Sequence, residues 1–182
     1  MPYTVPGLDA DDAKQIAQTL QERLTSLIDL QLTLKHVHWN VVGPNFIAVH
    51  ELLDEHVEAV RGMTDAVAER IATLGHVPEG TPGAVVRSRT WDDYGLGRAT
   101  AQEHLAALDL VYAGVIVDHR RAITAFDELD LVSQGLLIGQ AEKLELHHWF
   151  VRAHLADASG GLPTADATHL REAAEAARAG GA

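Results

Sequence analysis

Apolar residues recur along most of the chain with the spacing expected of α-helices that cover a common core. Between about Asp9 and Val41 they follow a period close to 3.6 residues and form one stripe, which consists of Ile16, Leu20, Leu24, Leu27 and Leu34. The same kind of pattern predicts three further long helices, from about Phe46 to Leu74, Arg98 to Leu129 and Val132 to Ala156. Because alternating β-branched runs are missing, we expect an all-α fold.

The connection between the second and third helices is unusually long. It runs from His76 to about Gly97 and contains several glycines and prolines. In an all-helical protein such a crossover is typical of a ferritin-like four-helix bundle. Thr90 followed by Asp93 resembles a capping box and predicts that a short helix begins there. We therefore expect an N-terminal tail over residues 1–8, the bundle over 9–157 and a flexible C-terminal tail over 158–182, with one weak helix near 166–178.

Composition narrows the class of protein. The 182 residues are 47% hydrophobic and 22% charged, as in a soluble single domain, and no apolar run approaches the length of a membrane span. The first residues show no signal-peptide pattern, so we expect a cytoplasmic protein. The absence of cysteine excludes thiolate chemistry and iron–sulfur clusters. A formal net charge of −12 disfavours a protein that coats nucleic acid and suits one that gathers cations.

One stripe of the second helix collects ionisable groups. With His50 taken as zero and 100° per residue, Asp54, Asp65 and Glu69 fall at about 40°, 60° and 100°. A stripe of this width normally faces a core, where an unpaired charge is costly. A metal cation is one suitable partner, because carboxylates and imidazoles together bind iron, manganese or zinc.

A single chain cannot bring all of these groups to one metal. Asp54 and Asp65 are eleven residues apart, or about 16 Å along a helix, whereas metal–oxygen bonds are only about 2.0–2.2 Å long. An antiparallel copy of the helix solves the problem. Asp65 and Glu69 of one subunit then meet Asp54, His50 and His38 of another, where His38 comes from the end of the first helix. The geometry predicts an intersubunit metal site.

Three other interpretations stay open on this evidence. In the first, the stripe is a solvated face with ion pairs to Arg61 and Arg70. In the second, Glu145 and His148, three residues apart, belong to a di-iron site within one chain, although the second helix lacks a matching Glu-x-x-His. In the third, a carboxylate-bound metal activates water for hydrolysis.

The residues around the stripe resemble the Dps family, the mini-ferritins or DNA-binding proteins from starved cells. The resemblance rests on the block LKHVHWNVVGPNF over residues 34–46 and on the spacing of His38, His50, Asp54, Asp65 and Glu69. It extends over roughly residues 8–155 and is similar above all to actinobacterial members. It implies a hollow homododecamer whose intersubunit sites bind two iron ions each through these five residues. Family members oxidise Fe(II) with hydrogen peroxide or dioxygen and store ferric mineral, which protects against oxidative damage.

The resemblance also implies roles for other residues. Trp39 stands where the family keeps an oxidisable aromatic residue near the iron, and its other expected role is packing in the core. Lys35 and His36 are expected at the surface or behind the ligands. Acidic residues near the start of the fourth helix line the family's iron pores, and the candidates here are Asp127, Glu128 and Asp130.

The family name suggests DNA as a further partner, but the tails do not favour it. Members that bind DNA usually carry a tail rich in lysine and arginine. Here the first twelve residues contain three aspartates and no basic residue, and the segment from Ser159 onward has more acidic residues than arginines. We therefore expect an iron-storing ferroxidase, with a DNA-binding, nucleoid-protecting protein as the alternative and a metal-dependent hydrolase as a further one.

Overall fold

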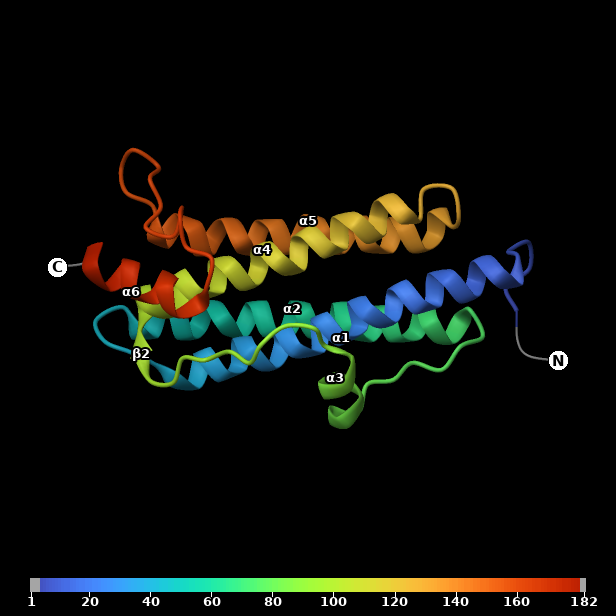
Figure 1. Cartoon of the computed structure of the whole chain (residues 1–182), viewed down its shortest axis with the longest axis horizontal. Helices are drawn as coiled ribbons and strands as arrows, with labels where there is room; N and C mark the ends of the chain where they lie inside the picture. The colour runs from blue at the N-terminus through green and yellow to red at the C-terminus, as the bar shows by residue number, and fades with distance from the viewer. Residues whose placement is uncertain (1–3, 181–182) are drawn as a thin grey trace. The chain divides into compact units, whose positions relative to one another are not determined.

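The computed structural model describes residues 4–180, and four long helices dominate it (Figure 1). They are α1 (Ala10–Asn40), α2 (Phe46–Thr73), α4 (Ala101–Ala125) and α5 (Leu131–Leu155). The predicted four-helix bundle is confirmed, and the five residues of the apolar stripe on α1 are all buried. α4 ends four residues earlier than expected, because the chain turns at Phe126, whose side chain is fully buried.

The short helix of the crossover is not where the sequence predicted it. α3 (Pro82–Ser88) begins after Thr81, whose hydroxyl accepts a hydrogen bond from the Ala84 amide, and Pro82 occupies the first turn. Thr90 to Asp93 is not helical, and the Trp91 indole donates to Asp29 instead. The reciprocal capping box lies further on, between Thr100 and Glu103. It begins α4, and just before it β2 (Ala99–Thr100) pairs in parallel with β1 (Val41–Val42).

The chain divides into two compact units, and each long helix contributes to both. The first unit contains the described residues up to 31 together with 59–91 and 115–142. Its core is aliphatic, with Phe126 at one end of α4, and a buried glutamine spans it: the Gln140 amide donates to the backbone carbonyl of Met63 and contacts the ring of His119. This unit carries Asp65 and Glu69.

The second unit contains residues 32–58, 92–114 and 143 onward. Aliphatic residues again form most of its core, which also encloses several polar side chains. Tyr112 is completely buried and its hydroxyl lies 2.9 Å from His56 Nδ1. The His56 ring stacks on His147 with centroids 3.9 Å apart. This unit carries His38, His50 and Asp54.

The C-terminal segment differs from the expected flexible tail, because the described residues 158–180 pack as part of the second unit. α6 (Leu170–Gly180) buries one alanine face, formed by Ala173, Ala174 and Ala177. Arg178 pairs with Glu103, and the Thr164 hydroxyl donates to Asp109 Oδ2 over 2.6 Å. Among the described residues, no helix has the length and apolar character that a membrane crossing requires.

Candidate metal centre

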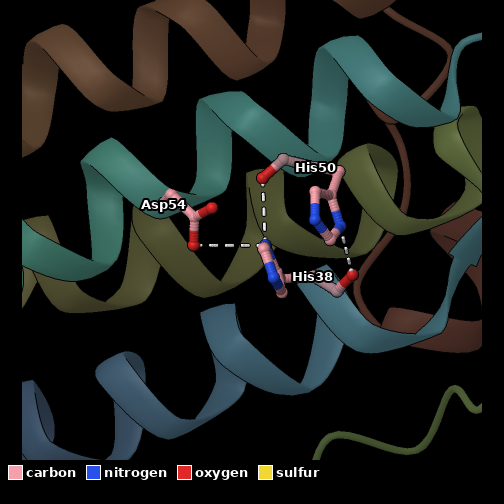
Figure 2. Close-up of side chains that lie close together, drawn as sticks. All are labelled: His38, His50 and Asp54. Atoms are coloured by element: carbon pink, nitrogen blue, oxygen red, sulfur yellow. Dashed lines mark hydrogen bonds and ion pairs between the residues drawn. The ribbon is translucent and has the colours of Figure 1, made fainter.

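Within the second unit, the end of α1 and the first turns of α2 bring together two histidines and a carboxylate. His38 lies two residues before the end of α1, and His50 and Asp54 are one turn apart on α2 (Figure 2). Potential ligand atoms of these three residues all lie within 4.8 Å of one another. In the part of the chain that the structure describes, this is the one such group of three or more. Burial decreases from His38, which is buried, through His50 to Asp54, which is exposed.

The two imidazoles hold each other in place through the backbone. His38 Nδ1 lies 3.0 Å from the carbonyl oxygen of His50, and His50 Nδ1 lies 3.0 Å from the carbonyl oxygen of His38. A carbonyl oxygen can only accept, so each Nδ1 carries the proton. In a neutral ring this leaves the lone pair on Nε2, which is the form that binds a metal. This reciprocal pair is the kind of outer hydrogen bonding that orients metal-binding histidines.

The rings are stacked, with centroids 3.6 Å apart and planes inclined by 22°. A metal bound to an imidazole nitrogen lies in the plane of that ring. Two nearly parallel rings that lie 3.6 Å apart therefore do not both direct a lone pair at one metal position. The ring separation is close to the spacing of about 3.5–4 Å between the ions of two-metal sites.

Asp54 already has a cationic partner. Lys35 Nζ donates to Asp54 Oδ1 over 2.6 Å, and the same oxygen lies 3.4 Å from His38 Nδ1. The hydrogen bond from Lys35 lowers the pKa of the Asp54 carboxyl group, so this carboxylate is ionised at neutral pH. Lys35 therefore contacts a predicted ligand directly, which is the supporting position expected for a residue behind the ligands. His36 points elsewhere, and its Nε2 lies 2.7 Å from the carbonyl oxygen of Leu96.

The other two predicted ligands do not join this group within one chain. Asp65 and Glu69 lie further along α2, in the first unit, and both are exposed. The expectation that the stripe faces the core of its own bundle is therefore wrong. Asp65 lines an open groove of about 410 Å³, together with Leu24, Ile28, Arg61, Thr64, Ala68, Pro78 and Gly80. The carboxylates are thus available to another molecule.

Trp39 is 71% exposed, so the expected role in core packing is wrong. Its backbone continues α1 directly after the buried His38. Because α1 turns by about 100° per residue, consecutive side chains point in different directions, and the one after a buried residue can reach solvent. The indole remains free to meet another subunit or solvent.

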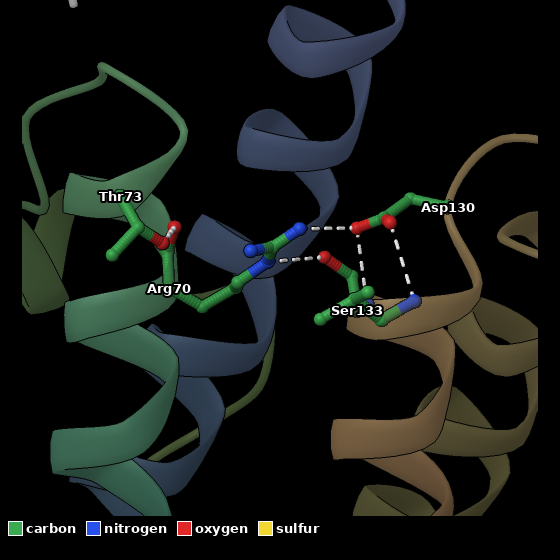
Figure 3. A network of polar contacts seen from close by, with 5 residues as sticks. Arg70, Thr73, Asp130 and Ser133 are labelled. Atoms are coloured by element: carbon green, nitrogen blue, oxygen red, sulfur yellow. Dashed lines mark hydrogen bonds and ion pairs between the residues drawn. The ribbon is translucent and has the colours of Figure 1, made fainter. Parts of the chain in front are cut away.

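Asp130, one of the pore candidates, caps the start of α5 and pairs with an arginine of α2. Its two carboxylate oxygens accept from the amides of Val132 and Ser133 and so cap α5. Arg70 binds both ends of this cap, with Nη2 2.6 Å from Asp130 Oδ2 and Nε 2.9 Å from the Ser133 hydroxyl (Figure 3). Burial acts to raise the pKa of Asp130, but the hydrogen bonds from Ser133 and Arg70 outweigh it and lower the pKa. Asp127 and Glu128 are exposed and stay candidates.

Arg70 is therefore not a surface partner of the α2 stripe.

The intrachain di-iron interpretation also loses its histidine, because His148 Nε2 lies 2.6 Å from Asp109 Oδ1. Asp109 was not among the predicted residues. It is buried and accepts hydrogen bonds from Arg152 and Thr164 as well. Its only signal in the sequence is an acidic residue between the apolar positions Leu108 and Leu110 of a helix, which is too common to single out.

Comparison with known proteins gives a consistent result. A family model described as "Ferritin-like domain" matches residues 17–160. The DNA protection during starvation protein of Mycolicibacterium smegmatis is 58% identical over 176 residues, which are 97% of this chain and 96% of that protein. The structure of Mycobacterium smegmatis Dps has a TM-score of 0.91 at 58% identity and covers 93% of this chain and 97% of its own. DpsA14 from Streptomyces coelicolor has a TM-score of 0.87 at 56% identity, over 88% and 95% of the two chains.

Proposed function

This chain belongs to the Dps family of ferritin-like proteins, and on that premise we propose that it is a cytoplasmic ferroxidase that oxidises Fe(II) and stores the ferric product in a dodecameric cage. The observation that carries the proposal is the reciprocal His38–His50 pair beside the Asp54 carboxylate. Two imidazoles with oriented lone pairs and one ionised carboxylate suit Fe(II), and the stacking of the rings suits two iron positions.

The site needs carboxylates that its own chain does not bring to it. Two irons gain charge when they are oxidised, and one carboxylate neutralises little of that charge. Asp65 and Glu69 are exposed one turn apart on α2. A two-fold axis that relates two antiparallel α2 helices places them against His38, His50 and Asp54 of the partner and forms two equal sites. Oxidation by hydrogen peroxide is a two-electron step, for which one electron from each of two irons is sufficient.

The test uses the purified, assembled protein. Fe(II) is added anaerobically, hydrogen peroxide or dioxygen follows in separate runs, and the absorbance of soluble ferric species is recorded. Wild-type protein is expected to oxidise iron much faster than buffer does and to keep it in solution. His50→Ala should slow the reaction at least tenfold without changing the assembly, whereas His169→Ala, at an exposed histidine outside the group, should not. A His50→Ala rate equal to wild type would refute the site.

DNA binding is the second candidate, because the relative from Mycolicibacterium smegmatis is named for DNA protection. The charge of the C-terminal segment argues against direct binding, since Arg178 is already paired with Glu103. A gel-shift titration at low salt, where phosphate contacts are strongest, tests it. A shift of duplex DNA that disappears with added salt would establish this function beside the first.

A further inference from the structure

Lys35 lies beside the candidate centre and contacts one of its three residues directly. It precedes His38 by three residues on α1, so the two side chains share a face of the helix. Its ammonium group lies 2.6 Å from Asp54 Oδ1, and that oxygen is the atom that approaches His38 Nδ1. The lysine and the histidine therefore converge on one oxygen of the carboxylate that the candidate centre offers as a ligand.

We propose that the Lys35 ammonium group is a built-in counter-ion that occupies the cation position at Asp54 until a divalent metal displaces it. The inference rests on the proposed function. Iron loading is then an exchange, in which the Lys35–Asp54 ion pair breaks as the metal–Asp54 bond forms. Lys35 orients the carboxylate and balances its charge in the empty protein, and it lowers the affinity of the site for metal.

The physical reason is the repulsion between an ammonium group and a metal ion that are held by the same carboxylate group. A protonated lysine has no lone pair, so it cannot become a ligand, and two cations a few ångströms apart repel each other. A divalent ion prevails because it carries twice the charge and also binds an imidazole nitrogen, which an ammonium group cannot do. In the single chain the lysine side chain is 31% exposed and that of Asp54 is 53% exposed, so the packing of the subunit itself does not lock the ammonium group in place.

The same exposure limits the size of the effect. Ion pairs that are partly in water are weak, so removal of Lys35 should tighten metal binding by a few-fold, to about fivefold, rather than by orders of magnitude. The alternative is an ordinary surface ion pair that only joins α1 to α2. In that case removal of Lys35 weakens the fold slightly and leaves the metal affinity unchanged.

The experiment measures binding of Co(II), which is not oxidised under these conditions, to the assembled protein by its visible absorption in competition with a chelator. Lys35→Met is expected to bind Co(II) about two- to fivefold more tightly than wild type. Lys14→Met is the matched control, because Lys14 is an exposed lysine on the same helix and its loss changes the net charge equally. If Lys35→Met does not assemble, Lys35→Gln replaces it.

A double-mutant cycle separates local displacement from long-range repulsion. In the Asp54→Asn background, Lys35→Met should no longer change the residual Co(II) affinity. An unchanged affinity in Lys35→Met, or an equal gain in Lys14→Met, overturns this inference while the proposed centre stands. Failure of the wild-type protein to bind Co(II) at all, or binding that His50→Ala leaves intact, overturns the proposed centre and this inference together.

Discussion

The buried Asp109 carboxylate holds three hydrogen-bond donors together, and we expect the small change Asp109→Asn to lower the free energy of unfolding strongly. The carboxylate is 3% exposed and accepts three hydrogen bonds of 2.6–2.7 Å, from His148, Arg152 and Thr164. Asparagine keeps the shape but removes one charge and one accepting oxygen, so that either the Thr164 O–H or the pair formed by His148 and Arg152 faces an NH₂ group that cannot accept. At least one buried donor is therefore left without a partner, which costs about 1–3 kcal/mol.

The loss of charge adds to this cost. Hydrogen bonds to a charged group are worth about 1.5–3 kcal/mol each, but the Arg152 side chain is 48% exposed, so water screens its share. We expect a total loss of about 3 kcal/mol in the free energy of unfolding. For a chain of this size that corresponds to a fall of roughly 6–12 °C in Tm.

Thermal and urea unfolding, followed by circular dichroism, provide the measurement, with Asp92→Asn at an exposed position as the control. The pH dependence is a second criterion. The hydrogen bonds of His148, Arg152 and Thr164 outweigh burial and hold the pKa of Asp109 well below its usual value. The carboxylate therefore contributes its full stability above the unfolded pKa near 4 and loses it as the pH falls further. A variant within 0.5 kcal/mol of the control, with an unchanged acid limb, would refute the reasoning.

Three further changes test other parts of the fold. Arg70→Met should cost about 1–2 kcal/mol, because it removes the cation beside the Asp130 cap, and a double-mutant cycle with Asp130→Asn should show that the two effects are coupled. Burial lowers the pKa of His119 to about 4, so the unfolded chain binds a proton at this residue more readily than the folded chain does. The free energy of unfolding should therefore fall as the pH drops from about 6.5 toward 4. His119→Gln should flatten this pH dependence when it is measured by urea titration. Ala177→Asp places a charge on the buried face of α6 and should release the segment, which limited proteolysis would detect as faster cleavage after residue 157.

Local pattern was sufficient for the helices. The period of apolar residues identified all four long helices to within a few residues, because a helix that covers a core must repeat its apolar side chains about every 3.6 positions. Capping was ambiguous by contrast. Thr81, Thr90 and Thr100 each precede residues that permit a helix start, but only Thr81 and Thr100 cap one. The sequence around Thr90 does not show that the Trp91 indole binds Asp29, a contact between residues 62 positions apart.

Spacing along the sequence also selected His50 and Asp54, because residues one turn apart on a helix share a face whatever surrounds them, and it selected His38 because a short turn separates the end of its helix from the start of theirs. Tertiary structure decided what else reaches them. Lys35 contacts Asp54 across 19 residues, Arg70 contacts Asp130 across 60, and the C-terminal segment contacts Asp109 across 55. Such contacts depend on how the helices pack, and helical periodicity specifies which face of a helix is buried but not which residue it meets. Sequence alone therefore determined the helices and the chemical type of the candidate ligands. The packing of the helices determined which other side chains bind those ligands, and Lys35 at Asp54 is the clearest case.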